Sequence, residues 1–211
     1  NISPDGFPLS KKTYHHGNLA ESLLDAVDDI ATRFGLEAVT LRSCAKQVGV
    51  SPSAAFRHYA DKRALMTAFA TRALEQLSAS LSTAKTAAEQ QQHNAFESVT
   101  LAYVAFALDK PAFFRAMWRE EGIYIEDEAY ACATRTLQAK LHSGFADTLE
   151  DTDAQSLSAT ELLAWSSVHG LASLMVEGTV AKGKSRSEQL EQAQAMIAGL
   201  LPLTGATDRS H

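Results

Sequence analysis

Apolar residues recur at helical spacing through most of this chain, and helix caps fall between the apolar runs. The first helix is predicted to begin at Asn18, which has a capping-box partner in Glu21, and to end at Gly35. Its apolar positions are separated by four, three and four residues, which places them on one face: Leu23, Val27, Ile30 and Phe34. Alternating strand patterns are nearly absent, so the sequence predicts an all-α protein of about nine helices.

The later helices are predicted from the same signals. Asp61 caps a long helix that fades in the polar stretch 83–93, which is interpreted as a helix–helix connection. Ser158 and Ser185 each precede a glutamate by three residues, the spacing of a capping box. The remaining helices are expected over about 95–108, 111–118, 126–149, 158–178 and 185–201, with an acidic surface linker at 150–153.

A tight turn at Gly49 joins two short predicted helices. Thr40 caps the first of them, and Gly49 can take the left-handed conformation that ends it. Ser51 and Pro52 supply the N-cap and the first position of the second helix, which is expected to run to about Tyr59. This arrangement suits a helix-turn-helix motif, whose second helix lies in the DNA major groove.

The net charge of −6 is unfavourable for a DNA-binding protein, but this charge is distributed unevenly along the chain. From Ser10 to Lys62 there are seven basic and six acidic residues, which leaves +1, whereas Asp5 contributes −1 and the chain from Arg63 onward carries −6. Screening confines these fields to ~8–10 Å, so the local sign decides what the motif attracts.

Composition excludes several other classes of protein. No apolar run approaches the ~20 residues that a membrane span needs, and the N-terminal segment has no apolar core of a secretory signal. We therefore expect a cytoplasmic protein, in which Cys44 and Cys132 are unpaired thiols.

Enzyme signatures are equally scarce. The sequence has no Glu-x-x-His pair, no glycine-rich phosphate loop and no nucleophile elbow. The acidic residues between Glu120 and Glu128 are interpreted as a solvated loop and helix start rather than a metal site. The sequence thus predicts no catalytic site, no metal and no cofactor.

These residues together resemble the TetR-type (tetracycline-repressor-like) family of bacterial transcription regulators. The family pattern is T-x-x-x-I-A-x-x-x-G-V-S-x-x-x-x-Y-x-H-F-x-x-K-x-x-L, and this chain matches it at Thr40, Ala45, Gly49, Val50, Ser51, His58, Lys62 and Leu65. Cys44, Phe56 and Tyr59 replace the usual Ile, Tyr and Phe. The segments YHHGN at 14–18 and WSSVHGLA at 165–172 are similar to a subgroup with such an arm and a C-terminal Trp/His/Gly motif.

The resemblance implies a flexible arm over 1–17, a DNA-binding domain over 18–65, an effector-binding and dimerisation domain over 66–205, and a disordered tail over 206–211. It implies a ligand-responsive repressor that binds a palindromic operator as a homodimer and is released by a small molecule. One recognition helix buries too little surface for tight specific binding, and two must lie ~34–36 Å apart, which favours a dimer. A helical small-molecule-binding or interaction protein that does not use DNA remains the alternative.

The DNA contacts expected from the resemblance are Thr40, Arg42, Ser51, Ser53, Ala54, Arg57, His58, Tyr59 and Lys62, with Lys12, Tyr14 and His15 from the arm. Arg57 can meet a guanine edge or a phosphate, and Ala54 can touch a thymine methyl. Tyr59 is expected to pack against the first helix with its hydroxyl near the surface. Phe56 cannot donate to phosphate as the usual Tyr does, so it is assigned to packing alone. The arm either enters the minor groove or is disordered.

Aromatic residues are frequent in the C-terminal region, and such a stripe at helical spacing is more typical of a core than of a pocket. The resemblance implies that some of them line an effector cavity. The candidates are Tyr103, Phe106, Phe114, Met117, Trp118, Trp165 and His169. Tyr103 and Trp118 are preferred because each joins a large apolar face to a polar group. His169, which precedes Gly170, is interpreted as a hydrogen-bonded core histidine at a close helix approach.

Overall fold

The computed structural model describes residues 18–119, 121–145 and 159–200, and within these ranges the chain is helical and without strands. The elements are α1 (Leu19–Phe34), η1 (Leu36–Ala38, a 3-10 turn), α2 (Leu41–Val48), α3 (Pro52–Phe56), α4 (Lys62–Gln91), α5 (Ala95–Asp109), α6 (Pro111–Met117), α7 (Glu128–Phe145), α8 (Ala159–Val176) and α9 (Arg186–Leu200). The predictions for 1–17, 150–153, Ser158 and 206–211 lie outside the described residues.

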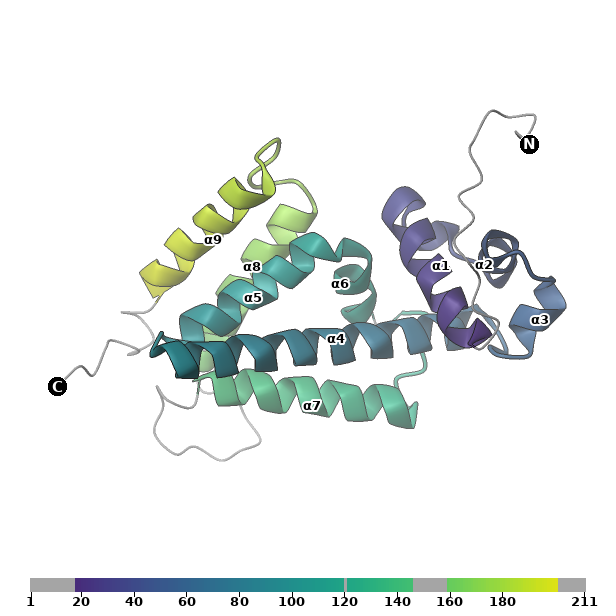
Figure 1. The fold of residues 1–211 in the computed structure, drawn as a ribbon, viewed down its shortest axis with the longest axis horizontal. Helices are drawn as coiled ribbons and strands as arrows, with labels where there is room; N and C mark the ends of the chain where they lie inside the picture. Colours follow the sequence, from purple (N-terminus) through teal and green to yellow (C-terminus); the bar gives the residue numbers. More distant parts are fainter. Residues whose placement is uncertain (1–17, 120, 146–158, 201–211) are drawn as a thin grey trace.

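The first three α-helices form a small module at one end of α4 (Figure 1). Its core is made of side chains that are at most 4% exposed: Leu23, Leu24, Val27, Val39, Leu41, Cys44, Ala45 and Ala55. The prediction that Phe34 completes the apolar stripe of α1 is wrong, because its side chain is 71% exposed. Gly35 turns the chain with φ 82°, so the stripe ends one turn earlier, at Ile30.

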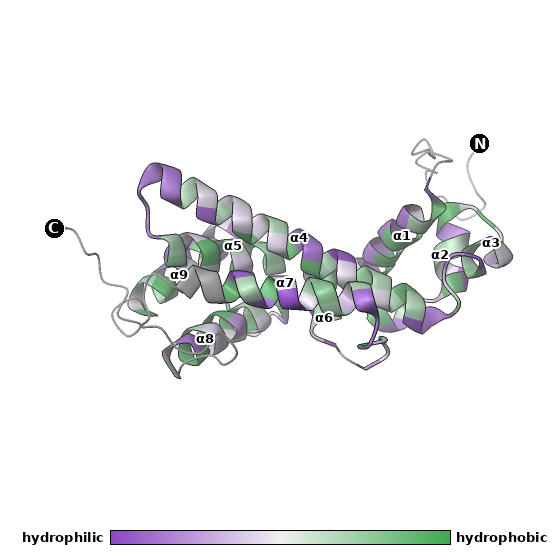
Figure 2. Cartoon of the chain, turned by 90° about the horizontal axis from the view of Figure 1, so that it is seen from below, coloured by the Kyte–Doolittle hydropathy of each residue, from purple (hydrophilic) through white to green (hydrophobic). Residues whose placement is uncertain are grey.

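Helix α4 joins the module to the rest of the protein as one uninterrupted element of 30 residues. The interpretation of 83–93 as a connection is wrong, since α4 continues to Gln91 and ends at Gln92 with φ 56°. Its final turns are rich in Ala, Lys, Glu and Gln, which are good helix formers although they are polar. Figure 2 shows this polar end of α4 projecting toward the connection with α5.

The C-terminal domain is built on the second half of α4. Helices α5 and α7 pack on α4, and α8 and α9 pack on the other side of α5, while α6 contacts α1, α4 and α5 (Figure 1). Large side chains that are 2% exposed or less fill the space between these helices, including Phe69, Leu77, Leu81, Tyr103 and Phe113. The sequence predicts α5, α6, α8 and α9 within about two residues of their observed bounds.

Candidate DNA interface and ligand pocket

The turn between α2 and α3 is built from the local interactions that its sequence predicts. Thr40 and Ser43 form a reciprocal capping box at the start of α2. Gly49 adopts the left-handed conformation, with φ 79° and ψ 28°, and ends α2. The Ser51 hydroxyl accepts from the backbone N–H of Ala54 at 3.2 Å and thereby caps α3. The sequence prediction of a helix-turn-helix is confirmed.

Helix α3 is shorter than expected, because it ends at Phe56 rather than near Tyr59. The N–H groups of His58 and Tyr59 both bond to the carbonyl of Ala55, which tightens the chain into a turn. Arg57 and His58 therefore lie just past the helix, on the turn. Ala55 is fully buried, so it holds α3 against the module and cannot itself reach DNA.

The outer surface of α2, α3 and the turn gathers several of the expected DNA contacts. Arg42, Ser53, Arg57 and His58 are exposed, and Ala54 is partly buried. The assignment of Phe56 to packing alone is wrong, because 46% of its side chain is exposed. Thr40 and Ser51 are exposed too, but their hydroxyl groups serve the helix caps.

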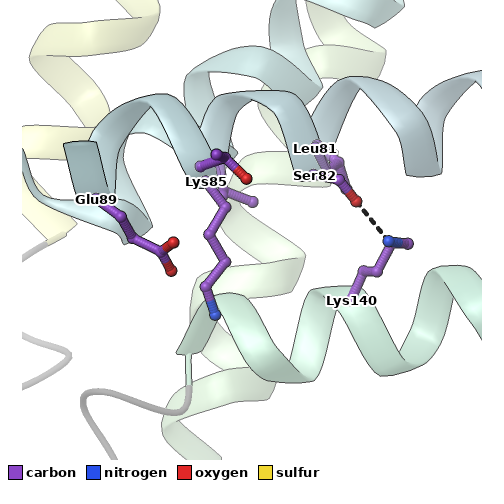
Figure 3. Close-up of a pocket in the computed structure, with 7 residues that line it drawn as sticks. Leu81, Ser82, Lys85, Glu89 and Lys140 are labelled. Atoms are coloured by element: carbon purple, nitrogen blue, oxygen red, sulfur yellow. Dashed lines mark hydrogen bonds between the residues drawn. The ribbon is translucent and has the colours of Figure 1, made fainter. Parts of the chain in front are cut away.

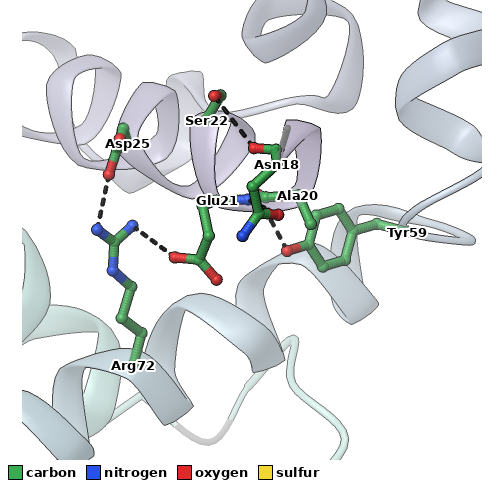
Figure 4. Close-up of polar contacts among 7 residues, drawn as sticks. All are labelled: Asn18, Ala20, Glu21, Ser22, Asp25, Tyr59 and Arg72. Atoms are coloured by element: carbon green, nitrogen blue, oxygen red, sulfur yellow. Dashed lines mark hydrogen bonds and ion pairs between the residues drawn. The ribbon is translucent and has the colours of Figure 1, made fainter. Parts of the chain in front are cut away.

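The Tyr59 hydroxyl is turned toward the protein, whereas Lys62 is exposed. The Tyr59 hydroxyl donates to the carbonyl of Ala20 on α1 at 3.3 Å, and burial raises the pKa of Tyr59 to about 12 (Figure 4). The predicted packing of this ring on the first helix is confirmed. The Lys62 ammonium lies 3.5 Å from the carbonyl oxygens of Leu36 and Glu37 in η1.

Acidic side chains of α1 are paired within the fold. Arg72 of α4 lies 2.7 Å from Asp25 and 3.7 Å from Glu21, and it ties the module to α4 (Figure 4). Arg33 lies 3.0 Å from Asp29. These pairs neutralise much of the negative charge that the sequence assigns to the first helix, which leaves Arg42 and Arg57 to set the local sign at α3.

The segment between α6 and α7 holds the start of α4, and no sequence pattern indicates this role. Arg63 donates through Nε to the carbonyl of Ile123 at 2.8 Å, and the Tyr124 hydroxyl donates to Asp61 at 2.7 Å. The backbone N–H of Ala64, and then Tyr124, stabilise the Asp61 carboxylate and lower its pKa. Arg119 pairs with Glu37 of η1 at 2.6 Å. The C-terminal domain is thus bonded both to η1 and to the start of α4.

Five of the seven ligand candidates meet in one aromatic cluster between α5, α6 and α8. Trp165 stacks on His169 with ring centres 5.5 Å apart, and Trp118 lies 5.0 Å from His169. Tyr103 lies 5.2 Å from Trp165, and Phe114 lies 5.5 Å from His169. Trp118 is 40% exposed, so the cluster opens toward the surface on that side.

His169 is a hydrogen-bonded histidine, as the sequence predicts. Its Nδ1 lies 2.9 Å from the hydroxyl of Tyr103, and burial lowers its pKa. Burial also raises the pKa of Tyr103, so the phenol stays protonated and can donate this bond. The expected close helix approach at Gly170 is wrong, because a Cβ at that position would meet nothing within 4 Å.

Phe106 and Met117 differ from the other candidates. They are 7% and 2% exposed and belong to the central core. Tyr103 and Trp165 instead border a small apolar cavity of about 10 Å³. Five further residues line it, none of them a candidate from the sequence: Phe96, Val99, Thr100, Leu141 and Val168. They come from three helices, so no local pattern brings them together.

Two other kinds of site are absent from the part of the chain that the structure describes. No group of three His, Cys, Asp or Glu side chains is arranged to hold a metal ion there. No described helix combines the length and apolar character that crossing a bilayer requires.

Comparison with known proteins assigns the class. Residues 23–69 match the model of bacterial regulatory proteins of the tetR family, and residues 96–200 match the tetracyclin repressor-like C-terminal domain. The chain belongs to the TetR family of transcriptional regulators, with a DNA-binding N-terminal domain and a ligand-binding C-terminal domain. This family consists of regulators rather than enzymes.

Individual relatives agree with this assignment. The uncharacterized HTH-type transcriptional regulator YobS of Bacillus subtilis (strain 168) is 24% identical over 190 residues, which cover 88% of this chain and 94% of YobS. A protein of unknown function from Rhodococcus sp. RHA1 has the same fold, with TM-score 0.68, 25% identity, and coverage of 89% of this chain and 97% of that chain. The TetR family regulator PfmR from Thermus thermophilus is similar in fold at TM-score 0.64 and 18% identity, over 85% of this chain and 97% of PfmR.

Proposed function

We propose that this protein is a ligand-responsive repressor, which binds a palindromic operator as a homodimer and leaves it when a small molecule binds. It acts in the cytoplasm and has no catalytic role of its own. The observation that carries the proposal is the exposure of Arg57 and Ser53 at α3, beside Arg42, on a module in which Glu21, Asp25 and Asp29 are paired with arginines.

The DNA contacts divide into two kinds. Arg57 and Ser53 read base edges, and the Ala54 methyl meets a thymine methyl. Arg42, His58 and Lys62 hold phosphates, and so does the arm through Lys12, Tyr14 and His15 if it enters the minor groove. Tyr59 is omitted from the contacts because its hydroxyl is engaged by Ala20, and Thr40 and Ser51 act by capping α2 and α3.

The dimer is proposed to form through α8 and α9. Leu162, Leu163 and Leu174 of α8 are 51%, 49% and 45% exposed, and α9 packs beside α8. Apolar side chains on one exposed helix face are typical of an interface between subunits. The effector is proposed to enter the apolar cavity at Tyr103 and Trp165. A shift of the Trp165 ring there would move Trp118, which it contacts, and with it the neighbouring Arg119.

The DNA proposal is tested by selecting duplexes from a random library with the full chain and measuring the selected sequence by fluorescence anisotropy. We expect an inverted repeat, bound far more tightly than a scrambled duplex, with affinity that falls as salt rises. Equal binding to selected and scrambled duplexes would refute the proposal.

The dimer proposal is tested by sedimentation of a Leu162→Glu, Leu174→Glu double variant. We expect it to sediment as a monomer, because the two charges would have to be buried. The control is Phe34→Glu, which places the same charge on an exposed apolar position of α1. A double variant that stays dimeric would move the interface elsewhere.

A further inference from the structure

Two further cavities border α4, one toward each of its ends. The first lies between the C-terminal half of α4 and α7, has a volume of about 210 Å³ and is lined by no residue of the DNA-binding module (Figure 3). The second has a volume of about 300 Å³ and lies where the module meets the C-terminal domain. Its walls include Leu36 and Glu37 of η1, Met66 of α4, and Ala116 and Arg119 at the end of α6. The two domains are therefore not closely packed at this place.

An ion pair joins the domains across this second cavity. The guanidinium of Arg119 lies 2.6 Å from the carboxylate of Glu37, and it lowers the pKa of that carboxyl group. The two side chains are 47% and 77% exposed. An ion pair in contact with water contributes little stability, so a small displacement of either partner is enough to separate it.

On the side of the module, Glu37 is connected to the start of the helix-turn-helix. The carbonyl of its neighbour Ala38 accepts from the Ser43 hydroxyl at 3.3 Å, and Ser43 belongs to the capping box that begins α2. The next residue, Val39, is fully buried in the core of the module. A change in the position of η1 therefore reaches the first turn of α2, which carries the exposed Arg42.

On the other side, Arg119 is connected to the effector cluster. Its backbone N–H bonds to the carbonyl of Ala116 at 3.3 Å, so it lies in one turn with Trp118. The Trp118 ring is 5.5 Å from Trp165, which lines the apolar cavity. That cavity has a volume of only about 10 Å³, so an effector that enters it must push Trp165 or its neighbours aside. Such a displacement reaches the turn that carries Arg119.

We propose that the ion pair between Arg119 and Glu37 is a latch, which an effector opens by displacing Trp118. When the latch opens, η1 is released from the C-terminal domain and α2 loses its fixed position. The closed latch belongs to the operator-binding arrangement, because it coincides with an apolar cavity too small for an effector. This inference rests on the proposed function and adds the regulation of its effector site. The link acts on η1 directly and requires no movement of α4.

Hydrogen exchange measures the latch without DNA or effector. The amides of Ala38 and Val39 are bonded within the turn of η1, so they exchange when that turn opens. Arg119→Gln and Glu37→Gln should each speed this exchange by roughly two- to fivefold, the factor expected for the loss of an exposed ion pair. Arg119→Lys keeps the charge and should have a smaller effect. The double variant with Glu37→Arg and Arg119→Glu should restore slow exchange.

The matched control is an ion pair that does not cross between the domains. Arg115 of α6 lies 2.8 Å from Glu177, which follows α8, and the exposure of these two side chains is similar to that of the latch. Glu177→Gln should leave the exchange of the Ala38 and Val39 amides unchanged.

A cavity-filling substitution represents the effector, whose identity is unknown. Val168→Phe places a ring in the apolar cavity from α8, and Val99→Phe does so from α5, which provides a second variant if the first does not fold. Thermal unfolding establishes which variants are folded. Each folded variant should speed exchange at Ala38, and this effect should disappear when Arg119→Gln is also present.

Two exchange results would overturn the inference. One is unchanged exchange at Ala38 and Val39 in Arg119→Gln; the other is a cavity-filling effect of the same size with and without Arg119. Operator affinity, measured by anisotropy, should fall in Arg119→Gln by no more than the same factor for each subunit. Tighter operator binding would also contradict the latch as proposed.

The two readouts separate this inference from the proposed function. If an operator is bound but exchange in η1 does not respond to Arg119→Gln, the latch alone is refuted. If no operator exists, the proposed repressor function is refuted, while the exchange experiment still decides whether the cavity and η1 are coupled.

Discussion

The DNA-binding module and the C-terminal domain are both helical, yet they direct their polar groups in opposite ways. In the module, Arg42, Arg57 and His58 project outward, and many of the other hydrogen bonds serve caps and turns. In the C-terminal domain, Tyr103 and His169 bond to each other within an aromatic cluster. The module is therefore ready for a partner that arrives from outside, whereas the domain must rearrange internally to admit one.

The largest expected effect is the loss of operator affinity when the exposed charge of Arg57 is removed. Arg57→Ala should weaken operator binding by about 1–3 kcal/mol in each half-site, with the loss concentrated at one base position if Arg57 reads a base. Anisotropy against operators substituted at each position measures this. Arg33→Ala removes another exposed arginine, which is paired with Asp29, and it should leave affinity nearly unchanged. An equal loss in both variants would mean that only overall charge matters.

A glycine-to-alanine substitution should change the free energy of unfolding in opposite directions in the two regions. Gly49→Ala forces a side chain into the left-handed conformation and should destabilise the protein by about 1–2 kcal/mol. Gly170→Ala lies inside α8 with open space around the new methyl group, and it should stabilise by about 0.5–1 kcal/mol. Urea unfolding compares the two. Destabilisation by Gly170→Ala would show that α8 needs that space, for example for a ligand or a second subunit.

Phe56 offers a smaller gain in affinity. It lies exposed on α3 where the family pattern has a tyrosine, so Phe56→Tyr should add a hydrogen bond to phosphate worth about 0.5–1.5 kcal/mol. The gain should be similar on every operator variant, because a phosphate contact carries no sequence information. A change in base preference instead would indicate that the ring itself touches the bases.

The smallest effect concerns the internal histidine. Burial lowers the pKa of His169 below the 6.5 of an unfolded chain, so the unfolded state takes up a proton first as the pH falls. His169 should therefore cost no stability above about pH 6.5 and should destabilise the protein progressively as the pH falls through its folded pKa. NMR titration of the ring gives the midpoint, and His169→Gln should flatten this part of the pH dependence. A midpoint at or above about 6.5 would contradict the buried, neutral form.

What the sequence predicts also differs between the two regions. The caps at Thr40, Ser51 and Asp61 and the left-handed Gly49 depend on neighbours within four residues, and all of them are confirmed. The cavities bring together residues far apart in the chain, such as Ser82 with Lys140, and no local pattern could place them. The polar stretch at the end of α4 has no apolar stripe, and for that reason the sequence predicts a connection there. The stretch is helical because its residues have high helix propensity and because Ala88 is buried.

Helix α4 has one consequence for how the two regions communicate. It starts at Lys62, close to the recognition turn, and runs past Lys85, which borders a cavity between α4 and α7; as a continuous helix of 30 residues it is about 45 Å long. If α4 tilts as a rigid body by only a few degrees about its end near Lys85, its opposite end moves by several Å. In the proposed dimer, where the spacing of the two half-sites on a duplex is fixed, we expect such a shift to move the two recognition helices out of register with the DNA grooves.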